Sequence, residues 1–217
     1  ACSYLDFPVV SGNVSFYNET QKKAIPPTPT IGAVGLVKNL ENMMTIKLKE
    51  VGSCILVIGK TLGHLYQSEF FREVVGIKEG PPPEVNLFNE KNNGLTIQDL
   101  ISNKLVNSVH DISSGGMLVA LSEMCIAGKI GAKIKIPKKN INPHEYLFGE
   151  DQSRYIIEVN EKNKKKVCDI LKKNSVYYEI IGKTQKDSLD LEKEFNIKLS
   201  ELSKINSVWF RNYFDEN

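Results

Sequence analysis

The stretch VNSVHDISSGGMLVALSEMCIAG, residues 106–128, contains the patterns that decide the fold. Its apolar start around Val106 and Val109 predicts a short buried strand. Its second half repeats apolar residues at three- and four-residue spacing, which predicts a helix with one apolar face. Gly128 is expected to end that helix, because glycine readily adopts the left-handed conformation after a helix. The sequence therefore predicts a strand, a tight polar turn and a helix.

The turn between this strand and helix carries groups that suit a phosphate and its cation. It contains His110, Asp111, two serines and the pair Gly115-Gly116. A helix start offers unpaired N–H donors and partial positive charge, which favour an anion, and a carboxylate suits an accompanying magnesium ion. The same residue types are also ordinary helix caps, so a purely structural interpretation stays open. His110 alone is more typical of a hydrogen-bonded structural histidine.

Composition is that of a globular protein and argues against several function classes. The chain has 217 residues, of which 41% are hydrophobic and 25% are charged, values typical of globular domains. Its net charge of +2 comes from lysines spread along the chain and does not call for a nucleic-acid partner. Apolar runs are too short to span a membrane. Four cysteines without a C-x-x-C pair disfavour a zinc or redox motif, and a reducing cytoplasm is expected.

The first forty residues hold a second group of candidate site residues. Strands are expected at residues 5–10 and 30–37. Between them, Gly12 would let the backbone approach a ligand closely. Asn13 offers an oxygen for a hard cation, and Ser15 offers a hydroxyl on the same side of an extended segment. A plain loop with a glycine turn is the alternative. The missing initiator methionine indicates a piece of a longer chain.

The rest of the chain predicts strands that alternate unevenly with helices. A polar, turn-rich stretch at residues 39–50 indicates a domain boundary. Beyond it, strands are expected at 54–58, 130–136, 155–159 and 177–181, a loop at 140–146, and helices at 66–75, 96–105, 161–173 and 199–214. This pattern favours an α+β fold with a mixed sheet covered by helices. No G-x-G-x-x-G or Walker loop is present, which disfavours ordinary dinucleotide and P-loop sites.

A second polar cluster precedes the strand expected at residues 155–159. It reads LFGEDQSR at residues 147–154. It could support a ligand, but closure of a turn through Asp151 and Arg154 is the favoured interpretation. In the last expected helix, an apolar stripe that includes Ile205 and Trp209 is assigned to core or interface.

Taken together, several segments resemble one known family. They are PVVSGNVSFYNET (8–20) with PTPTIGAVGLV (27–37), EGPPPEVNL (79–87), the HDISSGG helix ending in CIAG (110–128), and LFGEDQSRY (147–155). In order and spacing they resemble the C-terminal part of the synthetase subunit of phosphoribosylformylglycinamidine synthase, in its small bacterial form. The resemblance covers essentially all 217 residues.

This resemblance implies a chain cut from two fused aminoimidazole ribonucleotide synthetase-like units. Residues 1–49 would be the end of the second ATP-binding domain, and residues 50–217 the second C-terminal domain, with an α+β fold. The implied reaction is an ATP-dependent ligation in purine biosynthesis. ATP phosphorylates the amide oxygen of formylglycinamide ribonucleotide, and ammonia displaces the phosphate to give the amidine. The family's catalytic histidines would lie in the absent first half, so the fragment is expected to be inactive alone.

The resemblance also implies site residues, cofactors and partners. Gly12 would contact ATP, Asn13 would bind Mg²⁺ and Ser15 would contact the substrate. Asp111 and Ser113 correspond to positions that hold magnesium and nucleotide at an auxiliary, structural site in larger relatives. The implied partners are the N-terminal half of the same chain, a glutaminase subunit that supplies ammonia, and a small accessory subunit.

One departure and two alternatives accompany this resemblance. The family usually has aspartate where this chain has Ser114, which lowers the negative charge of the turn. The chain could instead be a non-catalytic interaction domain of that enzyme. It could also belong to another ATP-dependent enzyme of the superfamily, such as a thiamine-phosphate or selenophosphate kinase, although residues 12–19 (GNVSFYNE) argue against this.

Overall fold

The computed structural model describes residues 1–13, 18–25, 29–37, 39–137 and 141–215. The chain divides into two compact units, Ala1–Met43 and Met44–Asn217. In the first unit the elements are α1 (Cys2–Leu5), β1 (Glu19–Thr20), β2 (Lys23–Ala24) and the 3₁₀ turn η1 (Leu40–Asn42).

Neither strand expected in the first unit is formed. Residues 5–10 contain the end of α1 and irregular backbone, and residues 30–37 form no strand. Their apolar side chains are exposed, with Val10 at 92% and Val34 at 95%. A strand persists only where a neighbour accepts its backbone hydrogen bonds. Among the described residues of this unit, only β1 and β2 pair with each other.

In the second unit, helices surround a sheet. The strands are β3 (Cys54–Ile58), β4 (Ser108–Asp111), β5 (Gly131–Ile134), β6 (Tyr155–Val159), β7 (Tyr178–Gln185), β8 (Ser188–Leu191) and β9 (Phe195–Lys198). The helices are the π-helix η2 (Phe71–Val75), α2 (Leu87–Ser102), α3 (Gly116–Gly128), α4 (Pro143–Phe148), α5 (Lys164–Lys173) and α6 (Leu199–Asp215).

The sheet is mixed, as the sequence predicted. Its strand order is β4-β6-β3-β7-β5-β8-β9. Only the β5–β8 pair is parallel among the described pairs, and the others are antiparallel. Strands β8 and β9 were not predicted, although SLDL and FNIK both alternate polar and apolar residues, because four residues are the shortest run in which such alternation indicates a strand.

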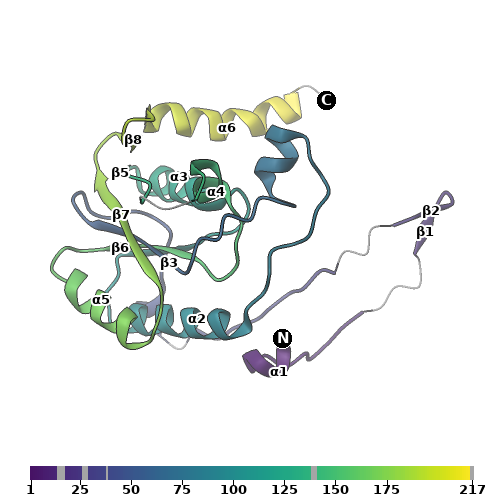
Figure 1. Cartoon of the computed structure of the whole chain (residues 1–217), viewed down its shortest axis with the longest axis horizontal. Coiled ribbons are helices and arrows are strands. Elements are labelled where there is room, and N and C mark those ends of the chain that lie inside the picture. The colour runs from purple at the N-terminus through teal and green to yellow at the C-terminus, as the bar shows by residue number, and fades with distance from the viewer. Residues whose placement is uncertain (14–17, 26–28, 38, 138–140, 216–217) are drawn as a thin grey trace. The chain divides into compact units, whose positions relative to one another are not determined.

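The core lies on both faces of the interior strand β3, all of whose residues are fully buried. Ile55 and Val57 belong to the cluster that α3 and α4 cover on one face. Leu56 belongs to the cluster that α2 and α5 cover on the other. Figure 1 shows these two pairs of helices on opposite sides of the sheet. A strand buried on both faces needs a continuous apolar run rather than an alternating one, which explains CILVI at residues 54–58.

Agreement between prediction and structure varies along this unit. Strands β3 and β6 match their predicted ranges residue for residue. Helix α2 begins nine residues earlier than expected, because Asn86 caps it by accepting a hydrogen bond from the Asn89 N–H. The loop expected at 140–146 is confirmed at residues 141 and 142 but is wrong from Pro143 onward, because a capping box at Asn142 starts α4 there.

Two expected helices differ in the faces that they bury. The helix expected at 66–75 is reduced to η2, and Val74 (70% exposed) and Val75 (47%) do not form the expected inner face. In α6, Leu202 packs against the core, whereas Ile205 and Trp209 are 64% and 67% exposed. The apolar stripe on α6 is therefore only partly core in this chain.

Helix α3 ends at Gly128 for a different reason from the one expected. The left-handed residue is Lys129, with φ 55°, and Gly128 is still helical. A Cβ added to Gly128 would lie 2.4 Å from the backbone oxygen of Leu48 and 2.6 Å from its nitrogen. Gly128 is required by this close approach of the Leu48 backbone rather than by its own torsion angles.

Two glycine-to-alanine substitutions in helices should therefore have opposite effects on stability. Gly128→Ala forces its Cβ into the Leu48 backbone and should lower the free energy of unfolding by about 1–3 kcal/mol. Gly94→Ala in α2 meets only the Tyr155 hydroxyl at 3.6 Å. It should raise the free energy of unfolding by about 0.5–1 kcal/mol, because alanine is the better helix former. Urea unfolding of both variants checks this, and a stabilising Gly128→Ala would contradict the packing argument.

Candidate functional site

Two polar segments predicted separately lie side by side, because β4 and β6 are antiparallel neighbours. Asp111 at the end of β4 pairs with Tyr155 at the start of β6. Just beyond, the Ile112 N–H donates to the Arg154 carbonyl oxygen (2.9 Å). Together with Glu90 of α2, the two segments line a cavity of about 350 Å³ whose other lining residues are Asp111–Ser114 and Glu150–Tyr155.

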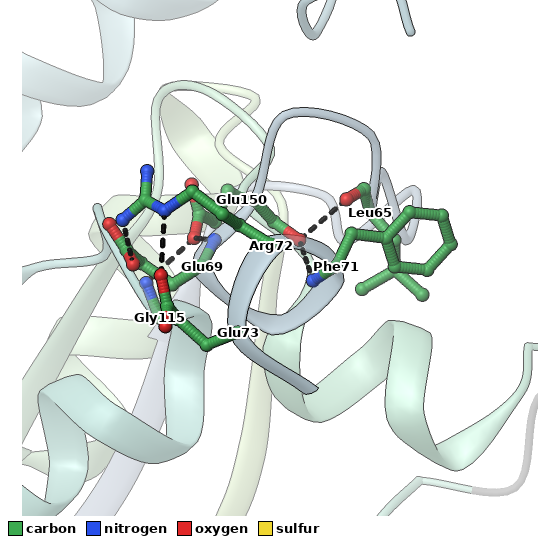
Figure 2. Close-up of polar contacts among 8 residues, drawn as sticks. Leu65, Glu69, Phe71, Arg72, Glu73, Gly115 and Glu150 are labelled. Carbon is green, nitrogen blue, oxygen red and sulfur yellow. Dashed lines mark hydrogen bonds and ion pairs between the residues drawn. The ribbon is translucent and has the colours of Figure 1, made fainter. Parts of the chain in front are cut away.

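The start of α3 is held by the carboxylate of Glu150. Its Oε1 accepts hydrogen bonds from the N–H groups of Gly115 and Glu69, both at 2.8 Å (Figure 2). The Gly116 N–H donates to the Ser113 carbonyl oxygen (3.1 Å). The expectation of unpaired donors is therefore wrong for these two groups. A carboxylate of the chain itself occupies part of the position where a phosphate was expected.

The neighbouring carboxylate, Asp151, fastens a second loop. It accepts hydrogen bonds from three consecutive N–H groups, those of Leu62 (3.0 Å), Gly63 (3.0 Å) and His64 (3.1 Å). Its side chain is 5% exposed. Burying a carboxylate costs several kcal/mol unless it is well hydrogen-bonded. These donors therefore hold the loop after β3 in one conformation.

Arg154 completes this arrangement from inside the protein. Its side chain is fully buried and lies 3.9 Å from Asp151. It also donates to the Thr61 hydroxyl (3.2 Å) and to the carbonyl oxygens of Asp151 (3.2 Å) and Gly149. Burial lowers the pKa of Arg154, and the Asp151 carboxylate opposes that shift. The interpretation of this segment as a turn closed by Asp151 and Arg154 is confirmed.

The side chains of the polar turn differ in how far they are fixed by other residues. His110 Nε2 lies 2.9 Å from Glu123, and Nδ1 lies 3.3 Å from Asp111. His110 is therefore hydrogen-bonded and structural, as expected. The Asp111 side chain is 65% exposed, and Asp111 and Ser113 both line the cavity.

Sequence reasoning missed Glu90, which lines the same cavity from the first turn of α2. Burial raises the pKa of Glu90, and a backbone hydrogen bond from Ser153 opposes the shift. The sequence pattern that could have located it is Asn86 as a helix cap followed by an acidic residue in the first turn, which together indicate a helix start.

The donor set at this cavity fits only a magnesium ion that another ligand also holds. No group of three or more His, Cys, Asp or Glu side chains within the described ranges could hold a metal ion. The carboxylates of Glu150 and Asp151 are committed to backbone N–H groups. Asp111 and Glu90 remain. Mg²⁺ is commonly bound by one or two carboxylates together with substrate phosphates, and these residues match that role.

Two of the three site residues predicted in the first unit are described, and no pairing with other described residues accounts for them. Gly12 and Asn13 are exposed in irregular backbone. A Cβ added to Gly12 would have no atom of the described residues within 4 Å, so no close approach among those residues explains the glycine. Ser15 lies outside the described residues.

Comparison with known proteins gives the class to which this fold belongs. Residues 50–192 match the family described as AIR synthase related protein, C-terminal domain. The chain therefore belongs to this family. Over the part of the chain that is described, no helix has the length and apolar character needed to cross a membrane.

More specific relatives cover nearly the whole chain. It is 51% identical over 215 residues to phosphoribosylformylglycinamidine synthase subunit PurL of Pelagibacter ubique, a match that covers 99% of this chain and 30% of that protein. PurL of Rhodopseudomonas palustris (strain BisB5) is 44% identical over 213 residues, covering 98% and 29%. The resemblance drawn from sequence is confirmed. The chain spans about 30% of the length of these relatives.

Solved structures confirm the expected fold. "T. maritima PurL complexed with FGAR" has a TM-score of 0.62 at 19% identity, covering 76% of this chain and 30% of that one. "T. maritima PurL complexed with ATP" has a TM-score of 0.59 at 18% identity, covering 76% and 28%. "Structure of PurLQS from Thermotoga maritima" has a TM-score of 0.59 at 17% identity, covering 76% and 28%. At these identities the likeness shows the fold alone.

Replacing the carboxylate of Asp151 should loosen the loop after β3. Asp151→Asn removes the charge that faces Arg154 and turns one acceptor into a donor. It should lower the free energy of unfolding by about 2–4 kcal/mol. Exposed Asp169→Asn on α5 is the control and should change it by less than about 0.5 kcal/mol. Hydrogen exchange should accelerate at the amides of residues 62–64, and unchanged protection there would contradict the assigned role.

Proposed function

We propose that this chain is part of the ATP-dependent ligase that converts formylglycinamide ribonucleotide and ammonia to formylglycinamidine ribonucleotide in purine biosynthesis. The observation that carries the proposal is 51% identity to a PurL subunit over 99% of the chain. In this reaction ATP phosphorylates the amide oxygen, and ammonia then displaces phosphate. The chain alone is proposed to be inactive, since the family's catalytic histidines fall outside it.

The proposed domain assignment follows the same resemblance. Residues 1–49 are the end of the second ATP-binding domain, and residues 50–217 are the second C-terminal domain. The division of the chain at Met43 and Met44 and the family match at residues 50–192 are consistent with this assignment.

We assign two sets of residues to ligand binding. Gly12 contacts ATP, Asn13 binds Mg²⁺ and Ser15 contacts the substrate. Asp111 and Ser113 contribute to an auxiliary nucleotide site with its own Mg²⁺, which is supported by the cavity that they line. When bound, Mg²⁺ would neutralise negative charge on the phosphates. The acidic lining of the cavity favours a phosphate that arrives with a cation over one that arrives alone.

The enzyme's partners are proposed from the same family. They are the N-terminal part of the same subunit, a glutaminase subunit that supplies ammonia, and a small accessory subunit, all in the cytoplasm. A solved structure titled PurLQS supports an assembly of this kind.

One observation favours the second candidate function, a non-catalytic interaction domain. The Gly115 N–H at the start of α3 is already satisfied by Glu150. The turn is therefore held in place without any nucleotide. In this alternative, the domain stabilises the enzyme and binds no nucleotide of its own.

A chimeric subunit tests the proposed activity. The corresponding segment of Pelagibacter ubique PurL is replaced by this chain, and amidine formation from ATP, ammonia and formylglycinamide ribonucleotide is measured. The chimera should be active, and the 217-residue chain alone should not be. Asn13→Ala in the chimera should reduce the rate at least about 100-fold, because a metal contact is worth several kcal/mol of transition-state stabilisation. A folded but inactive chimera, or turnover by the chain alone, would overturn the proposal.

Titration with ATP and Mg²⁺ separates the two candidate functions. If the auxiliary site binds nucleotide, the NMR resonances of Asp111 and Ser113 should shift, and Asp111→Asn should weaken binding about tenfold, as expected on losing a charged ligand. Asp169→Asn is the matched control and should leave binding unchanged. Resonances that stay still at saturating ATP would favour the interaction domain.

A further inference from the structure

A second, larger cavity adjoins the one described above. It has a volume of about 510 Å³ and shares residues 151–153 with the smaller cavity. Its walls come from the loop after β3, the start of α2 and the segment before β6. This volume lies within the range of about 300–1,000 Å³ typical of small-molecule sites. None of the residues carried over from the family lines it.

One wall of this cavity is aromatic and held in place. Tyr66 packs edge-on against Phe71 with ring centroids 5.4 Å apart. A Cβ added to Gly80 would lie 2.4 Å from the Tyr66 ring, so the backbone of Gly80 lies directly against it. Gln67 donates to the Gly80 carbonyl oxygen (2.9 Å), and His64 Nε2 lies 3.0 Å from the Pro81 carbonyl oxygen. Tyr66 is therefore pre-positioned, while 48% of it stays exposed.

Another part of the lining carries an amide oxygen that no described residue pairs and that is accessible from the cavity. Asn93 is 6% exposed, and its amide N–H groups donate to the carbonyl oxygen and hydroxyl of Ser153 (2.9 and 3.0 Å). No described residue donates to its Oδ1 atom. Within the described ranges, the side chains of Asn89 and Gln152 form no hydrogen bond and also line the cavity. These side-chain amides can form hydrogen bonds with the polar edge of a heterocycle that carries an amino group.

Charged groups lie on the same lining. Lys60 makes no ion pair with any described residue, and its ammonium group can bind a phosphate. Glu84 also lines the cavity and can accept a hydrogen bond from a hydroxyl group. The remaining acids are committed, because Asp151 holds the loop at residues 62–64 and Glu145 caps α4.

We propose that this cavity binds an adenine mononucleotide. The base lies against Tyr66 with its amino group donating to Asn93 Oδ1, Lys60 binds the phosphate, and Glu84 accepts from a ribose hydroxyl. This site goes beyond the proposed function, since it uses neither Asp111 nor Ser113 and needs no metal ion.

Calorimetric titration of the 217-residue chain with AMP, with EDTA present, tests the proposal. Binding should saturate by about 1 mM. IMP should bind at least about tenfold more weakly, because its 6-oxo group would face the Asn93 oxygen without a shared proton. Lys60→Ala should weaken AMP binding about tenfold, with Lys60→Arg restoring it. Tyr66→Ala should weaken binding about fivefold or more, whereas Tyr66→Phe should bind as the original chain does.

Matched control variants test whether AMP binds in this cavity rather than elsewhere on the protein. Lys166→Ala on α5 removes a lysine outside this cavity and should have no effect. Asp111→Asn should also leave AMP binding unchanged, so that failure of the auxiliary ATP site does not affect this result. The proposal is overturned by the absence of AMP binding, by equal binding of AMP and IMP, or by retained affinity in both Lys60→Ala and Tyr66→Ala. It is also overturned if Asp111→Asn abolishes AMP binding.

Discussion

The second unit depends on buried and half-buried carboxylates that accept hydrogen bonds from backbone N–H groups. Glu150 joins the start of α3 to the segment before η2, and Asp151 holds three consecutive residues of the loop after β3. Glu158 in β6 is fully buried and accepts from the N–H groups of Lys49 and Glu50. A carboxylate removed from water is tolerated only when such donors surround it. The loops that supply these N–H donors are therefore held in one conformation, because the carboxylates require their hydrogen bonds.

This constraint explains why two cavities meet at one short segment. Residues 151–153 are held on one side by contacts with the loop after β3 and on the other by Asn93 of α2. The antiparallel pairing of β4 with β6 then brings the polar turn against the same segment. Neither cavity could form around a mobile connection, since loops make up part of the walls of both.

The sequence predicted the buried strands β3 and β6 of the second unit well and long-range polar contacts poorly. The predicted ranges of β3 and β6 matched the structure residue for residue, because the ends of a fully buried strand coincide with the ends of its apolar run. Helix α2 was predicted too short, since its first turns are rich in asparagine and show little apolar periodicity. The polar turn at residues 110–116 was recognised, but its contact with Glu150 spans 35 residues and that of Asp151 with Leu62 spans 89. No local pattern encodes such pairs.

Arg154 has a consequence for which side chains this position can accept. Its guanidinium is fully buried beside Asp151, and arginine, unlike lysine, does not give up its proton in proteins. The buried charge is satisfied by acceptors on separate groups, namely the Thr61 hydroxyl and the carbonyl oxygens of Asp151 and Gly149. A lysine has a single nitrogen in place of the planar fork of donors, so it could not reach these acceptors together, and exchanging one cation for the other here is not a conservative change.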